Sequence, residues 1–276
     1  GSKFESGETG LRVLSWNVLR WDQMNLASGP AAGNREPMLR EILMENADVM
    51  CFHEFFEPAG SAVTRYKSNI DAIRSRGYTY YTFFPTSIIH NRTKFFGMAI
   101  FSKYPIVDSA TYNFGKTRHS EGLMFADIKV NGKVIRVFTT HLESFKLGKS
   151  SYYGTKENGM VAKTKSTLWS VRSAYQNRRS QMNIVKEKID LSPHPVVLIG
   201  NLGDVPNSET YNVLSENLDD AFLIRGRGLG RTFRNISPTL RLDYILVDKN
   251  IGINNFLISE SRYSDHYPIL ADISLR

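Results

Sequence analysis

Short apolar segments that each end in a polar or charged side chain constrain the fold of this chain most. In chain order these segments end at Asn17, Glu54, His141, Asp243 and the adjacent pair Asp265-His266. Apolar runs of this length are typical of buried strands. Because α/β proteins build their sites where strands end, we expect these side chains to gather at one edge of a sheet.

Turn and periodicity signals between these segments predict a mixed α/β protein. Asn131-Gly132 separates two alternating segments, 125–130 and 134–140, and Asn-Gly in this position strongly indicates a β-hairpin. Apolar residues recur at helical spacing within residues 38–43, 62–73 and 168–189. Hairpins combined with helix-separated strands favour two β-sheets packed face to face with helices outside.

The chain reads as one domain over residues 11–276, because no linker divides it. Residues 1–10, which open with Gly1-Ser2, are expected to be a cloning remnant and a disordered N-terminus. Residues 145–166 are polar and glycine-containing, so they are expected to form a mobile surface loop. We expect a monomer.

Composition excludes several classes of protein. The 276 residues are 41% apolar, which suffices for a large core, but no apolar run approaches the roughly 18 residues of a membrane-spanning helix. Cys51 is the single cysteine and lies in an apolar run, so an internal disulfide and a cysteine-based zinc site are both excluded. No signal peptide is visible, and the compartment stays unknown. The net charge of +8 favours a polyanionic partner, although many soluble proteins are mildly basic.

The residue types at the segment ends suit cleavage of a phosphate ester. Such a reaction needs a divalent cation, a group that positions the attacking water, and donors that stabilise the transition state. Glu54 suits an oxygen-binding cation, and protonated His141 or His266 suits a phosphoryl oxygen. Asp243 is able to orient one histidine. Each residue alone also has an ordinary structural interpretation, such as a strand-end carboxylate or a satisfied histidine.

Taken in order, these stretches resemble the endonuclease/exonuclease/phosphatase superfamily of metal-dependent phosphoesterases, which has the deoxyribonuclease-I-like fold. The resemblance extends from Leu11 to Ile273 and rests on the following stretches: Ser15-Trp16-Asn17-Val18, His53-Glu54, Gly97 to Ile106, Thr140-His141-Leu142, Arg241-Leu242-Asp243-Tyr244 and Ser264-Asp265-His266-Tyr267-Pro268. It implies a four-layered α/β sandwich, with two packed mixed β-sheets flanked by helices.

The resemblance also implies roles for individual residues and a Mg²⁺ or Mn²⁺ cofactor. The metal ligands would be Asn17, Glu54 and Asp265, and the phosphate contacts would be His141, Gly203 and His266. The catalytic residues would be His141, Asn201, Asp243, Asp265 and His266. The implied substrates are phosphorylated: a nucleic acid, a nucleotide, an inositol phosphate or a phospholipid head group.

One stretch departs from the family pattern. Residues 200–204 read Gly-Asn-Leu-Gly-Asp, where the family has Gly-Asp-Phe-Asn-Asp. Asn201 therefore replaces the aspartate that orients or deprotonates water, and losing a general base typically costs about 10²–10⁴ in rate. Gly203 replaces an asparagine that holds phosphate, and losing one such donor costs about 10²–10³.

Two hypotheses follow from this departure. The first is a divalent-metal-dependent phosphodiesterase or phosphatase whose rate is lowered by Asn201 and Gly203. The second is a catalytically inactive family member that binds a phosphorylated ligand or nucleic acid. A third hypothesis, independent of this departure, is a plain nucleic-acid-binding domain that uses the basic helix face near Arg178-Arg179, although such a face is more often solvated surface.

Overall fold

The computed structural model describes seven stretches of the chain: residues 9–22, 34–59, 66–89, 92–115, 121–143, 160–235 and 237–275. For Thr9, Asp22 and residues 160–174 only the backbone is described. Within these stretches, no helix is long and apolar enough to cross a membrane.

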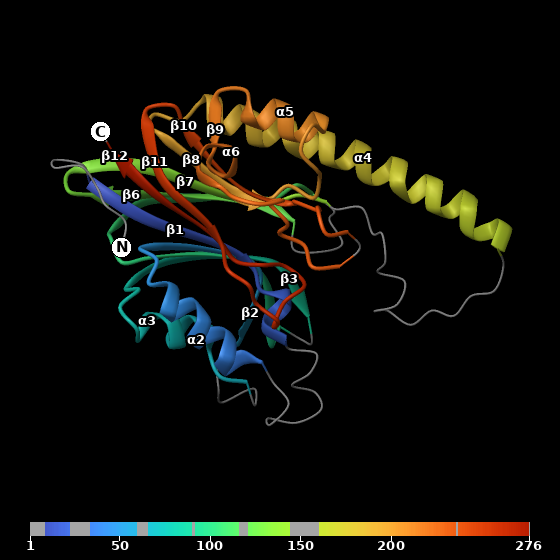
Figure 1. Ribbon diagram of the computed structural model, residues 1–276. Coiled ribbons are helices and arrows are strands. Elements are labelled where there is room, and N and C mark those ends of the chain that lie inside the picture. Colours follow the sequence, from blue (N-terminus) through green and yellow to red (C-terminus); the bar gives the residue numbers. More distant parts are fainter. Residues whose placement is uncertain are drawn as a thin grey trace.

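Two six-stranded sheets form the centre of the molecule (Figure 1). The first sheet has the order β11 (Ile251–Ile258), β12 (Ile269–Leu275), β1 (Thr9–Asn17), β2 (Val49–Pro58), β4 (Lys94–Ser102), β3 (Tyr80–Ile89). The second has the order β5 (Ile106–Tyr112), β6 (Gly122–Val130), β7 (Lys133–His141), β8 (Val196–Asn201), β10 (Asp243–Asp248), β9 (Leu218–Asp220). The β1–β2 and β7–β8 pairs are parallel, and the other pairs are antiparallel.

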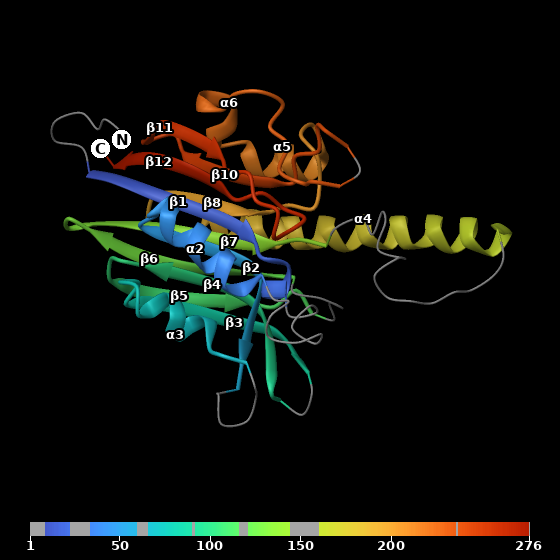
Figure 2. The ribbon, with the colours of Figure 1, turned by 60° about the horizontal axis from the view of Figure 1, so that its bottom comes forward.

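Helices cover the outer face of each sheet (Figures 1 and 2). The first sheet carries α2 (Arg35–Glu45) and α3 (Asn69–Arg74), and the second carries α4 (Met160–Asp190) and α5 (Glu209–Ser215). A short helix, α6 (Ala221–Arg225), lies by β11. Apolar residues fill the space between the sheets and the space under each helical layer. The predicted four-layered α/β sandwich is therefore confirmed.

The hairpin predicted at Asn131-Gly132 is present between β6 and β7. Asn131 has φ 49° and Gly132 has φ 85°, the left-handed conformations that a tight two-residue turn requires. The helix predicted over residues 38–43 is also present, with Met38, Leu39 and Ile42 buried.

Several predicted boundaries are wrong. β1 begins at Thr9, so residues 9–10 belong to the first sheet and not to a disordered terminus. The helix predicted over residues 62–73 begins only at Asn69 in the part of the chain that the structure describes. Of the loop predicted over 145–166, residues 145–159 lie outside the described residues and 160–166 are helical, because α4 begins at Met160.

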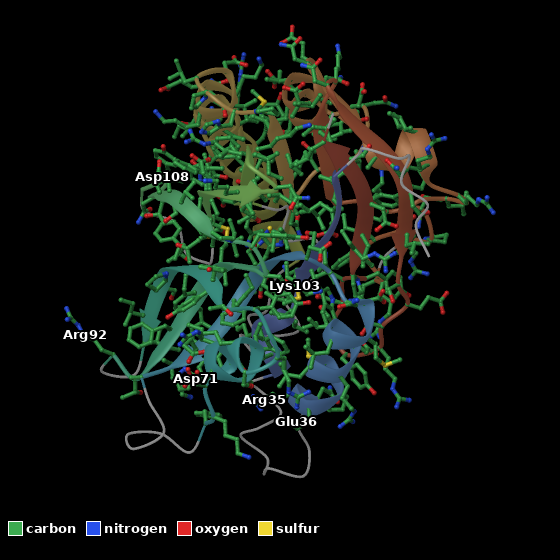
Figure 3. The ribbon with its side chains drawn as sticks, turned by 90° about the vertical axis from the view of Figure 1, so that its left-hand side faces the viewer. Arg35, Glu36, Asp71, Arg92, Lys103 and Asp108 are labelled. Atoms are coloured by element: carbon green, nitrogen blue, oxygen red, sulfur yellow. The ribbon has the colours of Figure 1, made fainter. Side chains whose placement is uncertain are left out.

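A polar junction anchors α2 and α3 to β2. Arg35, labelled with Glu36 in Figure 3, donates to Asn69 Oδ1 (2.6 Å) and to the carbonyl oxygen of Ser68 (2.9 Å). Glu57 on β2 accepts from the backbone N–H groups of Asn69 (2.9 Å) and Ile70 (3.0 Å). These contacts fix β2 at Glu57, which is three residues after Glu54.

Candidate active site

Strand register places three of the predicted site residues in one row across the second sheet. His141 on β7 pairs with Asn201 on β8, and Asn201 pairs with Asp243 on β10. All three side chains are buried. With His266, which lies against this row, they form what we call the imidazole half of the site.

His266 forms a buried ion pair with Asp243. Its Nδ1–H donates to Asp243 Oδ2 at 2.7 Å, and its backbone is held by Trp16 Nε1, which donates to the His266 carbonyl oxygen (2.9 Å). Burial opposes the charged ring, but the carboxylates of Asp243, Asp265 and Glu54 outweigh burial and raise the pKa of His266 to about 9. The ring is therefore a cation at neutral pH, and its Nε2–H is a second donor.

The side-chain amide of Asn201 has a defined orientation. Its Oδ1 accepts from the backbone N–H of Gly203 at 2.8 Å, and because that N–H only donates, Nδ2 must face the His266 ring. Nδ2 lies 3.5 Å from both ring nitrogens, so it is in line with neither. Asn201 consequently presents a donor to the site, where an aspartate would present an acceptor.

Asp204 does not replace the missing carboxylate at the site. Its oxygens accept from the backbone N–H of Val205 (3.0 Å) and from Thr210 Oγ1 (3.3 Å), and Arg178 Nε lies 3.5 Å away. Arg178 is buried and donates to the Gly203 carbonyl oxygen. The prediction that Arg178 contributes to an exposed basic helix face is therefore wrong, because its guanidinium supports the loop after β8.

The first sheet contributes Asn17 and Glu54, which we call the carboxylate half. Asn17 pairs with His53, and Asn17 Nδ2 donates to Glu54 Oε1 at 3.3 Å. β2 does not end at Glu54 as predicted but runs on to Pro58, with an irregularity between Phe52 and Phe55. Glu54 lies inside this irregularity with φ 51°, a left-handed conformation that re-aims its side chain.

The segment between β11 and β12, which carries His266, and a contact between the two sheets join the two halves. Ser264 Oγ donates to the Asn17 carbonyl oxygen (2.7 Å) and accepts from the His266 backbone N–H (3.1 Å), with Asp265 between these residues. His53 Nε2 lies 2.8 Å from Thr139 Oγ1 across the interface. The predicted site residues therefore lie around one edge of the two sheets: Asn17, Glu54, His141, Asn201, Gly203, Asp243, Asp265 and His266.

A left-handed turn follows Asn17. Leu19, Arg20 and Trp21 have φ values of 44°, 58° and 52°, and such a conformation costs roughly 1–2 kcal/mol per L-residue. Asn17 Oδ1 accepts from the Leu19 N–H (3.0 Å), and the buried Trp21 ring packs on Phe52 with a 6.0 Å centroid separation. The turn brings Arg20 Nε to 3.9 Å from Glu54 Oε2.

The oxygen atoms of the carboxylate half fit a magnesium-like cation. Magnesium usually takes one or two carboxylates and keeps several waters. Glu54 supplies one carboxylate, and the Asn17 amide lies beside it. Asp265 lies between Ser264, which contacts Asn17, and His266. Among the described residues, no group of three or more His, Cys, Asp or Glu side chains is placed to hold a metal ion, so a cation here would have one or two carboxylates and its own waters as ligands.

Sequence patterns did not identify several residues that shape the site. Thr232 Oγ1 accepts from the backbone N–H groups of Leu242 (2.9 Å) and Asp243 (3.1 Å), and no motif marks it. Arg20 also lacked a signal, because its role comes from a contact between a loop and a strand. His53 stood within a recognised stretch, but the pattern assigned it no role. Ser264 stood within a recognised stretch and was identifiable there.

Comparisons with known proteins agree with this fold. The sequence model described as the endonuclease/exonuclease/phosphatase family matches residues 14–266. A comparison with curated protein sequences finds no significant match.

Solved structures share the fold at low sequence identity. An endonuclease/exonuclease/phosphatase from Beutenbergia cavernae is 19% identical, with a TM-score of 0.68 over 96% of this chain and 72% of that chain. TDP2 of D. rerio, in complex with a single-strand DNA product, is 19% identical with a TM-score of 0.64 over 96% and 99%. The human Nocturnin catalytic domain with a bound sulfate anion is 19% identical with a TM-score of 0.66 over 98% and 97%.

Proposed function

Because this chain belongs to the endonuclease/exonuclease/phosphatase family, we propose that it hydrolyses a phosphate ester with a divalent cation, at a rate reduced by Asn201 and Gly203. The family name covers nucleases and phosphatases, which both cleave phosphate esters. The observation that carries the proposal is the buried Asp243–His266 pair, 2.7 Å apart, beside Asn201 and next to the carboxylate half.

The imidazole half would stabilise the phosphoryl group. His266 is held cationic by Asp243, and its Nε2–H is free of the Asp243 contact, so it suits a non-bridging phosphoryl oxygen. His141 stands two strands from Asp243 in the same row and would donate from the other side. Both donors are positioned before substrate arrives, so little reorganisation is needed.

The carboxylate half, together with Asp265, would hold the cation. Glu54, Asn17 and Asp265 would bind Mg²⁺ or Mn²⁺, which would neutralise charge on the phosphoryl oxygens. The protein residues would bind and orient the ester around it.

Asn201 limits the proposed reaction. Its amide cannot take a proton from water, and its Oδ1 is already used by the Gly203 N–H. Cation and histidine stabilisation remain, so residual turnover is expected. Asp204 is engaged by Thr210 and Arg178 and offers no substitute base.

A substrate panel assayed with magnesium and with manganese tests the proposal. The panel contains single-stranded and abasic DNA, nucleotides, inositol phosphates, sugar phosphates and phospholipid head groups. We expect Asn201→Asp to raise metal-dependent hydrolysis at least about tenfold, within the range of general-base effects. Gly203→Asn in the same protein should add to the gain.

Asp204→Asn is the matched control, because it alters a carboxylate next to the site without touching His266. It should leave turnover within about twofold of its parent, apart from any loss of stability. A flat response to Asn201→Asp together with loss of activity in Asp204→Asn would reverse the assignment of these two residues.

The orientation of the Asn201 amide favours a second candidate function, binding of a phosphorylated ligand without turnover. Nδ2 of Asn201 and the His266 ring present donors and positive charge to the same space, which suits an anion. This function predicts that the protein binds inorganic phosphate. It also predicts that neither the parent nor any variant hydrolyses a substrate of the panel.

The structure weakens the case for a nucleic-acid partner that the basic composition makes. Arg178 is buried, Arg179 lies 3.2 Å from Glu209, and Lys186 lies 2.6 Å from Asp190. These contacts neutralise part of the helix face that was expected to meet a polyanion. We propose a monomer acting on one phosphorylated substrate class, which the panel would identify.

A further inference from the structure

The turn after β1 brings a cation of the protein to Glu54. Arg20 Nε lies 3.9 Å from Glu54 Oε2, and Asn17 Nδ2 donates to Oε1 at 3.3 Å. Both oxygens of the carboxylate therefore face positively charged or hydrogen-bond-donating groups. Arg20 and Glu54 side chains are each mostly buried, with 24% and 12% of their surface exposed.

The Arg20 guanidinium is positioned by more than this ion pair. Its Cζ lies 5.2 Å from the centroid of the Phe96 ring, on the strand next to β2. A guanidinium over an aromatic face is attracted by the negative face of the ring. The ring thus keeps the charge beside Glu54 rather than in solvent.

Backbone strain lies on both sides of the contact. Arg20 is the middle of three successive left-handed residues, and Glu54 is left-handed inside the β2 irregularity. Strained residues persist only where their surroundings impose them, and they cluster at functional sites. Trp21, buried against Phe52 and Phe55, supplies the packing that imposes this turn.

We propose that Arg20 is a resident counter-cation of Glu54, and that a divalent cation must displace its guanidinium to bind there. This inference rests on the cation site of the proposed function. A guanidinium stays charged across the physiological range, so the competition persists at every working pH. Arg20 would then set a low affinity for the metal, in addition to any effect of Asn201.

Calorimetric titration of the metal-free protein with Mn²⁺ and Mg²⁺ tests the competition directly. Arg20→Met removes the charge. Arg20→Gly also removes it and places at this position a residue that adopts left-handed φ without strain. Both variants should bind the ions about three- to tenfold more tightly. This is the range expected when one partly exposed positive charge is removed from beside a cation site. Arg20→Lys should stay close to the parent.

Lys94→Met is the matched control. It removes the same charge from β4, but Lys94 lies over the Tyr66 ring, 4.9 Å from its centroid, and makes no contact with Glu54 among those the structure describes. Its ion affinity should stay within about twofold of the parent, as for a remote surface charge. Thermal melts of every variant establish that the comparison is between folded proteins.

Unchanged or weaker ion binding in both Arg20→Gly and Arg20→Met overturns the inference, and so does a protein in which no variant binds either ion. Tighter binding in Lys94→Met to the same extent also overturns it, because the effect would then be general charge. The proposed function fails separately: ion binding that depends on Arg20 without hydrolysis of any substrate ends the enzyme hypothesis and leaves the competition standing. Hydrolysis of a substrate by a protein whose ion affinity is the same in the Arg20 variants overturns the competition and leaves the proposed function standing.

Discussion

The imidazole half and the carboxylate half of the site differ in how firmly their side chains are held. In the imidazole half, regular strand pairing aligns His141, Asn201 and Asp243, and short hydrogen bonds of 2.7 and 2.8 Å hold His266 and Asn201. In the carboxylate half, Glu54 lies in an irregular stretch of β2, and its contacts are longer, at 3.3 and 3.9 Å.

This difference matches what each half would have to do. Donors aimed at a developing charge are most effective when they are fixed before the reaction, so a closed hydrogen-bonded set suits the phosphoryl group. A cation that keeps several waters needs fewer fixed ligands. The carboxylate half therefore tolerates a looser arrangement, with Arg20 in contact with the ligand that the ion would use.

The largest effect is expected from His266→Gln. Removing a preorganised donor to the phosphoryl group should lower metal-dependent hydrolysis by about 10²–10³, measured as kcat with the best substrate of the panel. Manganese affinity measured by calorimetry should stay within about twofold of the parent. A parallel fall of ion affinity would show that the two halves are not independent.

Asp243→Asn should change the charge of the imidazole half without removing its ring. The folded protein holds the pKa of His266 at about 9, above the ordinary value of about 6.5. The stabilisation from this proton is complete below about pH 6.5 and is lost as the pH rises through 9. In Asp243→Asn the pKa of His266 should fall, because burial lowers it and the carboxylate that most opposes burial is gone.

NMR titration of the His266 ring in metal-free protein measures this pKa directly. Thermal melts between pH 6 and pH 10 provide the second measurement, and the parent should lose more stability than Asp243→Asn over that interval. Asp265→Asn is the comparison variant, since Asp265 raises the pKa less than Asp243 does. An unchanged titration in Asp243→Asn would contradict the assigned ion pair.

The smallest effect is expected at Gly203, the left-handed residue of the loop that orients Asn201. Gly203 has φ 63°, so Gly203→Ala should lower the free energy of unfolding by about 1–2 kcal/mol in urea denaturation. Gly203→Asn should cost less, because asparagine tolerates this conformation better than alanine does. Equal losses in the two variants would mean that crowding, and not φ, limits this position.

Predictions that depended on local patterns were mostly confirmed. The Asn131-Gly132 hairpin follows from the φ values that its turn needs, and the helix at Met38 to Ile42 follows from its apolar spacing. Boundaries were less accurate where a strand continues past a polar residue. Glu54 is such a case, because a strand irregularity and a strand end both look like an interrupted apolar run.

By itself the sequence determined which residue types stand at the ends of the apolar segments, and in which order. It also showed that Asn201 and Gly203 depart from the family pattern. These properties are local, because turn chemistry and side-chain period act over a few neighbouring residues.

Only the tertiary structure decided what these residues face. Trp16 and His266, whose contact holds the ion pair in place, are 250 positions apart in the chain. The orientation of the Asn201 amide, the burial of Arg178 and the placement of Arg20 at Glu54 likewise depend on contacts between separate segments. Periodicity specifies which face of a strand is buried, but it carries no information on which distant strand or loop that face will meet.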